Sequence, residues 1–434
     1  MRIRTYLGLG AYAVVNAACE KPKNVIYYDQ YHTQDLPSKE LTHSITHVVM
    51  TFANSSLFSA SPGGNYQPFQ PLKEVRALFD HDIKLCLSVG GWGDNAGFDK
   101  GMRTDRSRQN FARNLASELD RLGYDCVDID MEYPGGNGQD YKQIPNSKKK
   151  YEIKAFPKLL KEIKTFVGDK ELSISVPGLK RDMIAYTPQE SVIMNKYVDS
   201  VHVMSYDLMN RRDHYTTHQV SVQGTARAID MYLALGFPAE KLVLGIPFYA
   251  KWFTTKKGYK CDHPIGCPTE LLENPDGSDT GKSGAMTFEA STLAPPPTNL
   301  TTSTDATCGA GTFLKCPTGN CCSPAGFCGT TAAHCGTGCQ STYGKCDGAD
   351  LTSSFRDALK HGHTDKANGG QWWWDAANRI FWTWDTPELI TEAINLMAKT
   401  RGVKSVMAWS LGEDSYDWSH LKAMQDGFNR VNGI

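Results

Sequence analysis

Acidic side chains alternate with apolar ones in the segment Asp125–Glu132, which reads Asp-Cys-Val-Asp-Ile-Asp-Met-Glu. Successive side chains of a β-strand point to opposite faces, so Asp128, Asp130 and Glu132 would share one face. Crowded carboxyl groups raise one another's pKa, because each negative charge disfavours the next. A glutamate that stays protonated near neutral pH can act as a general acid. The segment therefore predicts an acid catalyst at Glu132.

The same acids could instead bind a metal ion or form salt bridges. No histidine lies nearby in the sequence, although imidazole is a common ligand of transition metals. The interior of a parallel barrel is normally filled by branched apolar side chains, so carboxyl groups placed there need a functional reason. We expect catalysis without a metal ion or a cofactor.

Short apolar runs alternate with longer amphipathic segments from about residue 24 to 253, which is the pattern of strands and crossover helices. Segments such as Asp105–Leu122 and Tyr151–Val167 have helical spacing and would connect parallel strands. Eight strands fit a closed barrel better than an open sheet, so we predict an α/β protein with a (β/α)8 TIM barrel. The predicted strands are Asn24–Tyr28, His47–Phe52, Lys84–Val89, Cys126–Met131, Leu172–Val176, Ser200–Met204, Leu242–Pro247 and Ser405–Ser410.

The stretch between the seventh and eighth predicted strands is too long for one crossover connection, so an insertion is expected over 254–385. Its Pro- and Thr-rich part has the composition of a stiff linker, and eight cysteines crowd into Cys308–Cys346. The expected divisions are a signal peptide (1–18), the first part of the barrel with the start of the insertion (24–293), the linker (294–305), a small disulfide-rich module (306–347), and the end of the insertion with the last strand and helix (348–434).

The acidic segment resembles the DxxDxDxE signature of the family 18 glycosidases, the chitinase family. Further motifs of that family follow in the same order over about residues 24 to 430. They are SxGG at Ser88–Gly91, MxYD at Met204–Asp207, the strand-seven signature at Gly245–Tyr249, and the strand-eight tryptophan, Trp409. The resemblance implies a retaining glycosidase that hydrolyses β-1,4 linkages next to N-acetylglucosamine.

By this resemblance the substrate supplies its own nucleophile. Glu132 would protonate the glycosidic oxygen while the 2-acetamido carbonyl attacks the anomeric carbon, and water would then open the oxazolinium intermediate. Asp130 would orient and polarise the acetamido N–H and stabilise the positive charge. Asp128 would share a proton or a hydrogen bond with Asp130.

The resemblance also implies which residues bind the sugar. Tyr206 and Asp207 would hold the acetamido group and the reacting ring, and Trp409 would form the apolar floor under it. Trp92, just after the SxGG motif, is a candidate for stacking against a sugar. The remaining candidates for substrate contact are Tyr27, Met204 and Tyr249.

Several residues depart from the family pattern. Cys126 stands where a glycine is usual and Met131 where a tryptophan is usual, and both changes are expected to serve packing. Tyr31 stands where chitinases commonly place a sugar-stacking tryptophan. Ala250-Lys251 replaces the usual Gly-Arg, and the loop Asn210–Asp213 is more charged than we expect of a cleft for a neutral polymer.

These departures leave the exact substrate open. One alternative to a chitinase is an endo-β-N-acetylglucosaminidase that cleaves the chitobiose core of N-glycans. Another is a non-catalytic chitin lectin, although lectins of this fold usually lose the acid found here at Glu132. The run Trp372–Trp374 could pack in the core of the insertion or line the cleft.

The cysteine order in 308–346 resembles the hevein-type chitin-binding module. By resemblance, the disulfides would be Cys308–Cys322, Cys316–Cys328, Cys321–Cys335 and Cys339–Cys346. Such modules bind sugar with one serine and three aromatic residues. Ser323 and Phe327 retain two of these positions, whereas Ala325 and His334 occupy the others. Weak chitin affinity is therefore expected, and a purely structural role or another ligand remains an alternative.

Five further cysteines lie outside this module, and the first of them, Cys19, borders the expected cleavage site of the signal peptide. Cys261 and Cys267 could form a local disulfide. Cys86 and Cys126 lie in apolar strands, where buried free thiols are expected.

The composition bounds the location and the partners. The 434 residues include 13 cysteines and carry a formal net charge of -1, so there is no basic field for nucleic acid or for an anionic membrane. A basic start followed by an apolar run predicts a signal peptide, and dense cysteines indicate disulfides in an oxidising compartment. We expect a secreted monomer whose partner is chitin, a chito-oligosaccharide or an N-glycan.

Overall fold

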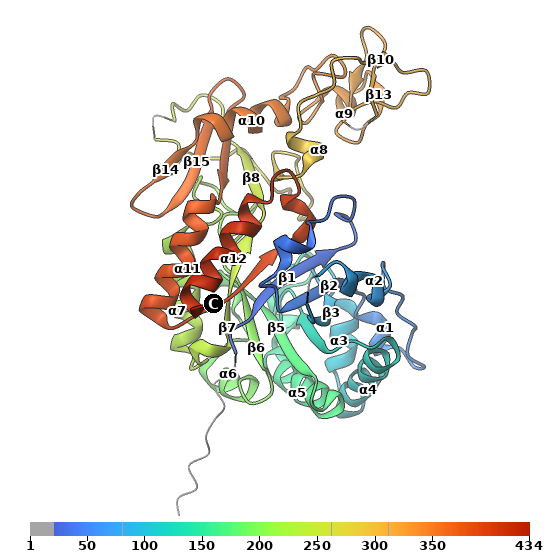
Figure 1. Ribbon diagram of the computed structural model, residues 1–434, viewed down its shortest axis with the longest axis vertical. Helices are drawn as coiled ribbons and strands as arrows, with labels where there is room; N and C mark the ends of the chain where they lie inside the picture. The colour runs from blue at the N-terminus through green and yellow to red at the C-terminus, as the bar shows by residue number, and fades with distance from the viewer. Residues whose placement is uncertain (1–20, 80, 262, 311) are drawn as a thin grey trace, which may run out of the picture.

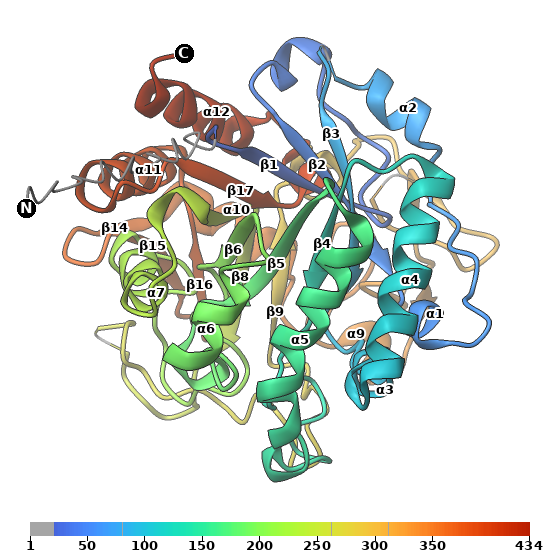
Figure 2. The same cartoon turned by 90° about the horizontal axis from the view of Figure 1, so that it is seen from below.

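Eight parallel strands form a closed barrel in this computed structural model, which describes residues 21–79, 81–261, 263–310 and 312–434 (Figures 1 and 2). The expected signal peptide lies outside the described residues. Neighbours around the barrel follow the order β1-β17-β7-β6-β5-β4-β3-β2. The strands are β1 (Asn24–Asp29), β2 (His47–Ala53), β3 (Lys84–Gly90), β4 (Cys126–Asp130), β5 (Glu171–Pro177), β6 (Ser200–Met204), β7 (Leu242–Pro247) and β17 (Ser405–Trp409).

Helices surround the strands, as the view along the barrel shows (Figure 2). The α-helices of the barrel are α1 (Ser56–Ser59), α2 (Leu72–Ala77), α3 (Ala96–Met102), α4 (Asp105–Leu122), α5 (Lys150–Val167), α6 (Pro188–Met194), α7 (Val222–Ala234), α11 (Pro387–Arg401) and α12 (Ser419–Asn432). Short 3-10 helices are η1 (Lys39–Thr42), η2 (Asn146–Lys148), η3 (Lys180–Asp182), η4 (Ala239–Lys241) and η5 (Leu411–Asp414). The predicted TIM barrel is confirmed.

Two apolar layers hold the barrel together. The outward side chains of the strands, Val127, Ile129 and Met131 among them, pack with the helices in one large buried cluster. Inside the lower part of the barrel, a second cluster contains Cys86 and Cys126. The strand alternation predicted for the acidic segment therefore holds, because its apolar residues face the helices.

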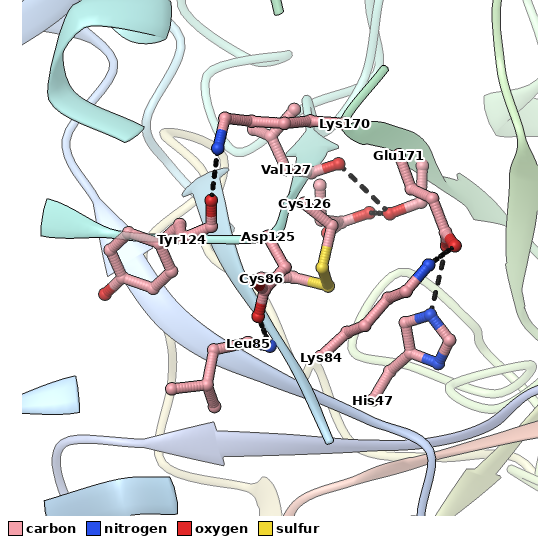
Figure 3. The surroundings of a disulfide bond; sticks show 12 residues. His47, Lys84, Leu85, Cys86, Tyr124, Asp125, Cys126, Val127, Lys170 and Glu171 are labelled. Carbon is pink, nitrogen blue, oxygen red and sulfur yellow. Dashed lines mark hydrogen bonds and ion pairs between the residues drawn. A yellow bond between two sulfur atoms is a disulfide. The ribbon is translucent and has the colours of Figure 1, made fainter. Parts of the chain in front are cut away.

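Cys86 and Cys126 form a disulfide bond (Figure 3), so the prediction of two free thiols was wrong. The parallel register of β3 and β4 places the two residues directly opposite each other, with their Cα atoms 4.3 Å apart. Their 40-residue separation in sequence gave no sign of this pairing, because the hydrophobic pattern of buried parallel strands does not reveal their register.

The insertion begins at β8 and forms a five-stranded antiparallel sheet. Trp373 packs in the apolar cluster of this sheet, while Trp372 and Trp374 pack against a smaller neighbouring cluster. In order, the strands of the sheet are β14 (His363–Asp365), β15 (Gly370–Asp375), β16 (Ile380–Trp384), β8 (Tyr249–Thr254) and β9 (Ser283–Thr287), accompanied by α8 (Ala290–Leu293) and α10 (Leu351–His361).

The cysteine-rich module, residues 306–347, extends from the end of α8 away from the barrel (Figure 1). Its four disulfides have the pairing implied by the resemblance, and Cys261 is also bonded to Cys267. The last residues of the expected linker pair with the module, because β10 lies parallel to β11. The short elements are β10 (Thr301–Thr302), β11 (Leu314–Lys315), β12 (Cys321–Cys322), β13 (Cys328–Gly329) and α9 (Ala332–Cys335).

Candidate active site

A cavity of about 440 Å³ opens at the C-terminal ends of the barrel strands, where TIM-barrel enzymes carry their active sites. Asp128 lies one layer deeper in the barrel, and the run Trp372–Trp374 is not part of the lining. The residues singled out by sequence that line the cavity are Tyr27, Trp92, Asp130, Glu132, Met204, Tyr206, Asp207, Tyr249 and Trp409.

Asp128 is fully buried and accepts hydrogen bonds from four hydroxyl groups. Ser173 donates to Oδ1 at 2.7 Å, while Ser88 at 2.9 Å, Ser175 at 3.1 Å and Tyr27 at 3.2 Å donate to Oδ2. These hydroxyls offset the cost of burying the carboxylate. The proton or hydrogen bond that Asp128 is expected to share with Asp130 stays a prediction.

Asp130 and Glu132 face the cavity under different constraints. Asp130 is 4% exposed, and its Oδ1 has no hydrogen-bond partner among the described residues. Burial raises the pKa of Asp130 well above its ordinary value, and the charges of Glu132 and Asp128 raise it further. Burial raises the pKa of Glu132 to about 7, and the charges of Asp207 and Asp182 contribute. Glu132 can therefore hold a proton near neutral pH and deliver it into the cavity.

Aromatic rings build the floor of the cavity. Trp409 stacks on Phe52, with the ring centroids 5.5 Å apart and the planes 18° apart, and Tyr27 packs beside it. The Tyr27 hydroxyl lies 2.7 Å from His202 Nδ1. Burial lowers the pKa of His202 to about 4, so this histidine is neutral near pH 7. The floor thus offers a flat apolar surface of the kind on which a pyranose ring packs.

Two side chains of the insertion sheet hold Asp207 in place. Tyr249 donates a hydrogen bond from its hydroxyl to Oδ1 at 2.8 Å, and Lys251 donates from Nζ to Oδ2 at 2.6 Å. Both residues belong to β8, and the Tyr249 ring meets Tyr206 edge-on. Lys251, noted in the sequence as a departure from the family pattern, therefore fixes one of the predicted binding residues.

The rim of the cavity has an exposed aromatic ring, Trp92, and two charged side chains, Asp182 and Arg212. Trp92 is 48% exposed and contacts the ring of Tyr133, so one face of it can receive a ligand. Tyr31 is 78% exposed and lies outside the lining. Asp182 after β5 and Arg212 after β6 also line the cavity. Arg212 belongs to the loop noted in the sequence for its charge, whereas sequence reasoning did not select Asp182, although charged residues just after a barrel strand lie where such active sites form.

The module carries its predicted sugar-binding pair away from the cavity. Ser323 is buried and accepts a hydrogen bond from the backbone N–H of Phe327 at 3.0 Å. The Phe327 ring is 54% exposed, and His334 packs against Gly329. The aromatic face of this predicted sugar-binding pair is therefore available to a ligand.

Two groups of side chains among the described residues come close enough to share a metal ion. Both consist of module cysteines, one group with Asp347, and these cysteines are already in disulfides. Within the same described part of the chain, no helix combines the length and the apolarity needed to cross a membrane.

Comparison with known proteins places the chain among glycosidases in sequence. The model of the glycosyl hydrolases of family 18 matches residues 23–414. The chain is 27% identical over 250 residues to a chitinase-like effector of Moniliophthora roreri, covering 53% of this chain and 59% of that protein. It is 24% identical over 298 residues to Chitinase 1 of Aphanocladium album, covering 61% of this chain and 65% of that protein. The chain thus spans about three fifths of the length of these two curated relatives.

Solved structures share the fold over nearly the whole chain. A chitinase from Rhizomucor miehei superposes with a TM-score of 0.63 at 18% identity, covering 93% of this chain and 99% of that one. A family 18 chitinase from Cycas revoluta, solved in complex with (GlcNAc)3, has a TM-score of 0.61 at 18% identity and the same coverage of 93% and 99%. At these identities the likeness establishes the architecture.

Proposed function

The chain belongs to the glycosyl hydrolases of family 18, and we propose that it hydrolyses β-1,4 linkages in polymers or oligomers of N-acetylglucosamine. The observation that carries this proposal is the partly buried Glu132 in the cavity lining, where desolvation raises its pKa to about 7. It stands at the end of β4 beside Asp130 and shares one cavity with the ring floor of Trp409. A protonated acid facing an apolar sugar platform is the arrangement that cleavage of a glycosidic bond requires.

In the proposed reaction, Glu132 transfers its proton to the glycosidic oxygen as that oxygen leaves the anomeric carbon. The carbonyl oxygen of the 2-acetamido group forms the new bond to the anomeric carbon, which gives an oxazolinium ion. Asp130, whose Oδ1 has no partner among the described residues, accepts the acetamido N–H and stabilises the positive charge. Water then opens the ring, and Glu132 takes up the proton that this water loses, so the configuration is retained.

The test is a product assay by mass spectrometry on a hexamer of N-acetylglucosamine. Glu132→Gln keeps the shape of the side chain without a transferable proton, so hydrolysis should fall by roughly 100-fold or more while binding of the oligosaccharide persists. Glu240→Gln, on η4 and outside the cavity lining, is the matched control and should behave as the wild type. Activity close to wild type in the Glu132 variant would refute the mechanism.

A second candidate is an endo-β-N-acetylglucosaminidase that cuts the chitobiose core of N-glycans. Lys251, Arg211 and Arg212, which depart from the family pattern and line the cavity, permit this function. A glycoprotein with intact N-glycans, assayed in parallel, separates the two functions. Loss of the glycan leaving one core sugar on the protein would identify the second activity, and short chito-oligomers alone would identify a chitinase.

For the rest of the molecule, we propose a secreted, monomeric enzyme whose hevein-type module binds chitin weakly. The disulfides support export, because they persist in oxidising compartments. Support for chitin binding comes from the exposed ring of Phe327 beside Ser323.

A further inference from the structure

One side of the cavity is a wall built around Arg212. The guanidinium donates hydrogen bonds to the backbone carbonyls of Asn137 at 2.8 Å and Gly138 at 3.1 Å. It also lies 4.0 Å from the centroid of the Tyr141 ring and 5.5 Å from the Trp92 centroid. Arg212 therefore joins the segment after β6 to the segments after β4 and β3.

The insertion extends and fixes this wall. Arg211 Nε donates to Glu273 Oε1 at 3.1 Å, and the Tyr141 hydroxyl donates to the same carboxylate. Gln143 donates to the backbone carbonyl of Asp276. The wall thus consists of the segments after β3, β4 and β6 together with the insertion, tied by hydrogen bonds, ring contacts and the ion pair of Arg211 with Glu273.

Asp182, at the end of η3, is the exception in this network. Its side chain lines the cavity and is only 3% exposed, yet Oδ1 has no hydrogen-bond partner among the described residues. The nearest cation to Oδ1 is Arg212 Nη1 at 3.6 Å, which is beyond hydrogen-bond distance. Buried acceptors are nearly always paired, so an unpaired one at a cavity wall points to a ligand donor.

The topology shows which part of a substrate lies there. In the barrel order, β17 stands across the barrel from β4, whereas β3 and β5 flank β4. Trp409 on β17, the proposed floor for the reacting sugar, therefore lies on the far side of the barrel from β4. Trp92 follows β3 and Asp182 follows β5, so both lie around Glu132. The group that leaves when Glu132 donates its proton must lie near these two residues.

We propose that Asp182 binds the leaving-group sugar by accepting a hydrogen bond from one of its hydroxyl groups, with Arg212 as the positioning residue that holds the carboxylate. This inference rests on the proposed glycosidase function and names a subsite for it. A sugar leaving group satisfies the unpaired Oδ1, whereas an aromatic leaving group without a neighbouring sugar hydroxyl does not. Asp182 therefore contributes to the choice of leaving group.

The test compares two substrates in the full-length protein: a tetramer of N-acetylglucosamine, whose leaving group is a sugar, and a 4-nitrophenyl chitobioside, whose leaving group is 4-nitrophenol. Asp182→Ala should lower kcat/KM for the tetramer about tenfold to a hundredfold, as expected for the loss of a hydrogen bond to a charged acceptor. Because Asp182 also raises the pKa of Glu132, both substrates are compared at pH 5, where Glu132 is protonated with or without Asp182, and kcat/KM for the aryl substrate should stay within about twofold. Asp182→Asn keeps an acceptor oxygen and should recover part of the loss.

Asp276→Ala is the control, because Asp276 belongs to the same wall but is exposed and outside the cavity lining. It should leave both substrates unaffected. If Asp182→Ala lowered kcat/KM equally for both substrates, or for neither, the proposed subsite would be wrong. If Asp182→Ala fails to fold, as thermal unfolding would reveal, the loss of kcat/KM on the two substrates is compared in Asp182→Asn instead. Wild-type protein inactive on both substrates would overturn the proposed function itself, which separates the two failures.

Discussion

At the scale of single residues, three carboxyl groups on one strand have three different surroundings. Asp128 accepts hydrogen bonds from four hydroxyl groups. Oδ1 of Asp130 has no partner within the part of the chain that the structure describes, and Glu132 stands at the cavity with a raised pKa. Neighbouring titratable groups in different environments can divide acid and stabilising roles between them. The sequence spacing predicted that the three share a face. It could not predict the hydroxyls, because these come from three other strands.

The pKa of Glu132 predicts how kcat/KM declines on the alkaline side of its pH profile. Only the protonated form donates to the glycosidic oxygen, so kcat/KM should fall as pH rises through about 7. Asp207 contributes to raising this pKa, and Asp207→Asn removes its negative charge. The midpoint of this decline should therefore move to lower pH in that variant, whatever activity remains. Initial rates from pH 5 to 9 measure both midpoints. A wild-type midpoint near 4.5, or an unmoved midpoint in the variant, would contradict this assignment.

At the scale of elements, β3 and β4 are linked in two successive layers inside the barrel. The lower layer is the disulfide between Cys86 and Cys126, and two residues further along each strand Ser88 donates to Asp128. Beside this disulfide, Glu171 pairs with Lys84 and His47 (Figure 3). The covalent link therefore lies directly below the deepest carboxylate of the proposed site.

Removing this link should destabilise the barrel more than removing a shorter disulfide. In the chain-entropy view, closing a 40-residue span contributes up to about 4 kcal/mol and closing a six-residue span about 2 kcal/mol. The double variant Cys86→Ala/Cys126→Ala should therefore unfold at a lower temperature than Cys261→Ala/Cys267→Ala. Scanning calorimetry of both variants and the wild type provides the comparison. Equal unfolding midpoints would show that the interior disulfide contributes no more than the local one.

At the scale of the whole molecule, sequence pattern predicted the barrel well because each strand is a short apolar run followed by a helix. The predicted and observed bounds of β6 and β7 are the same. Contacts between distant segments were not predictable, since they depend on loop paths. Lys251 reaches Asp207 from β8, a strand of the insertion sheet, and Asp182 meets Arg212 only through the packing of two loops.

The last prediction concerns the separate roles proposed for the barrel, which cleaves the bond, and the module, which binds the polymer. Phe327 is exposed on the module and outside the cavity lining, so it can act on an insoluble polymer without touching the bond that is cleaved. Phe327→Ala should weaken binding to chitin particles several-fold, the loss expected for one stacked ring, and leave hydrolysis of the soluble hexamer unchanged. Phe313→Ala is the matched control, because Phe313 is equally exposed on the same module at 55% but is not one of the residues assigned to sugar binding. Sedimentation with chitin measures both variants. If both lose binding equally, apolar area alone retains the module on chitin; if the wild type does not sediment, the module has a structural role or another ligand.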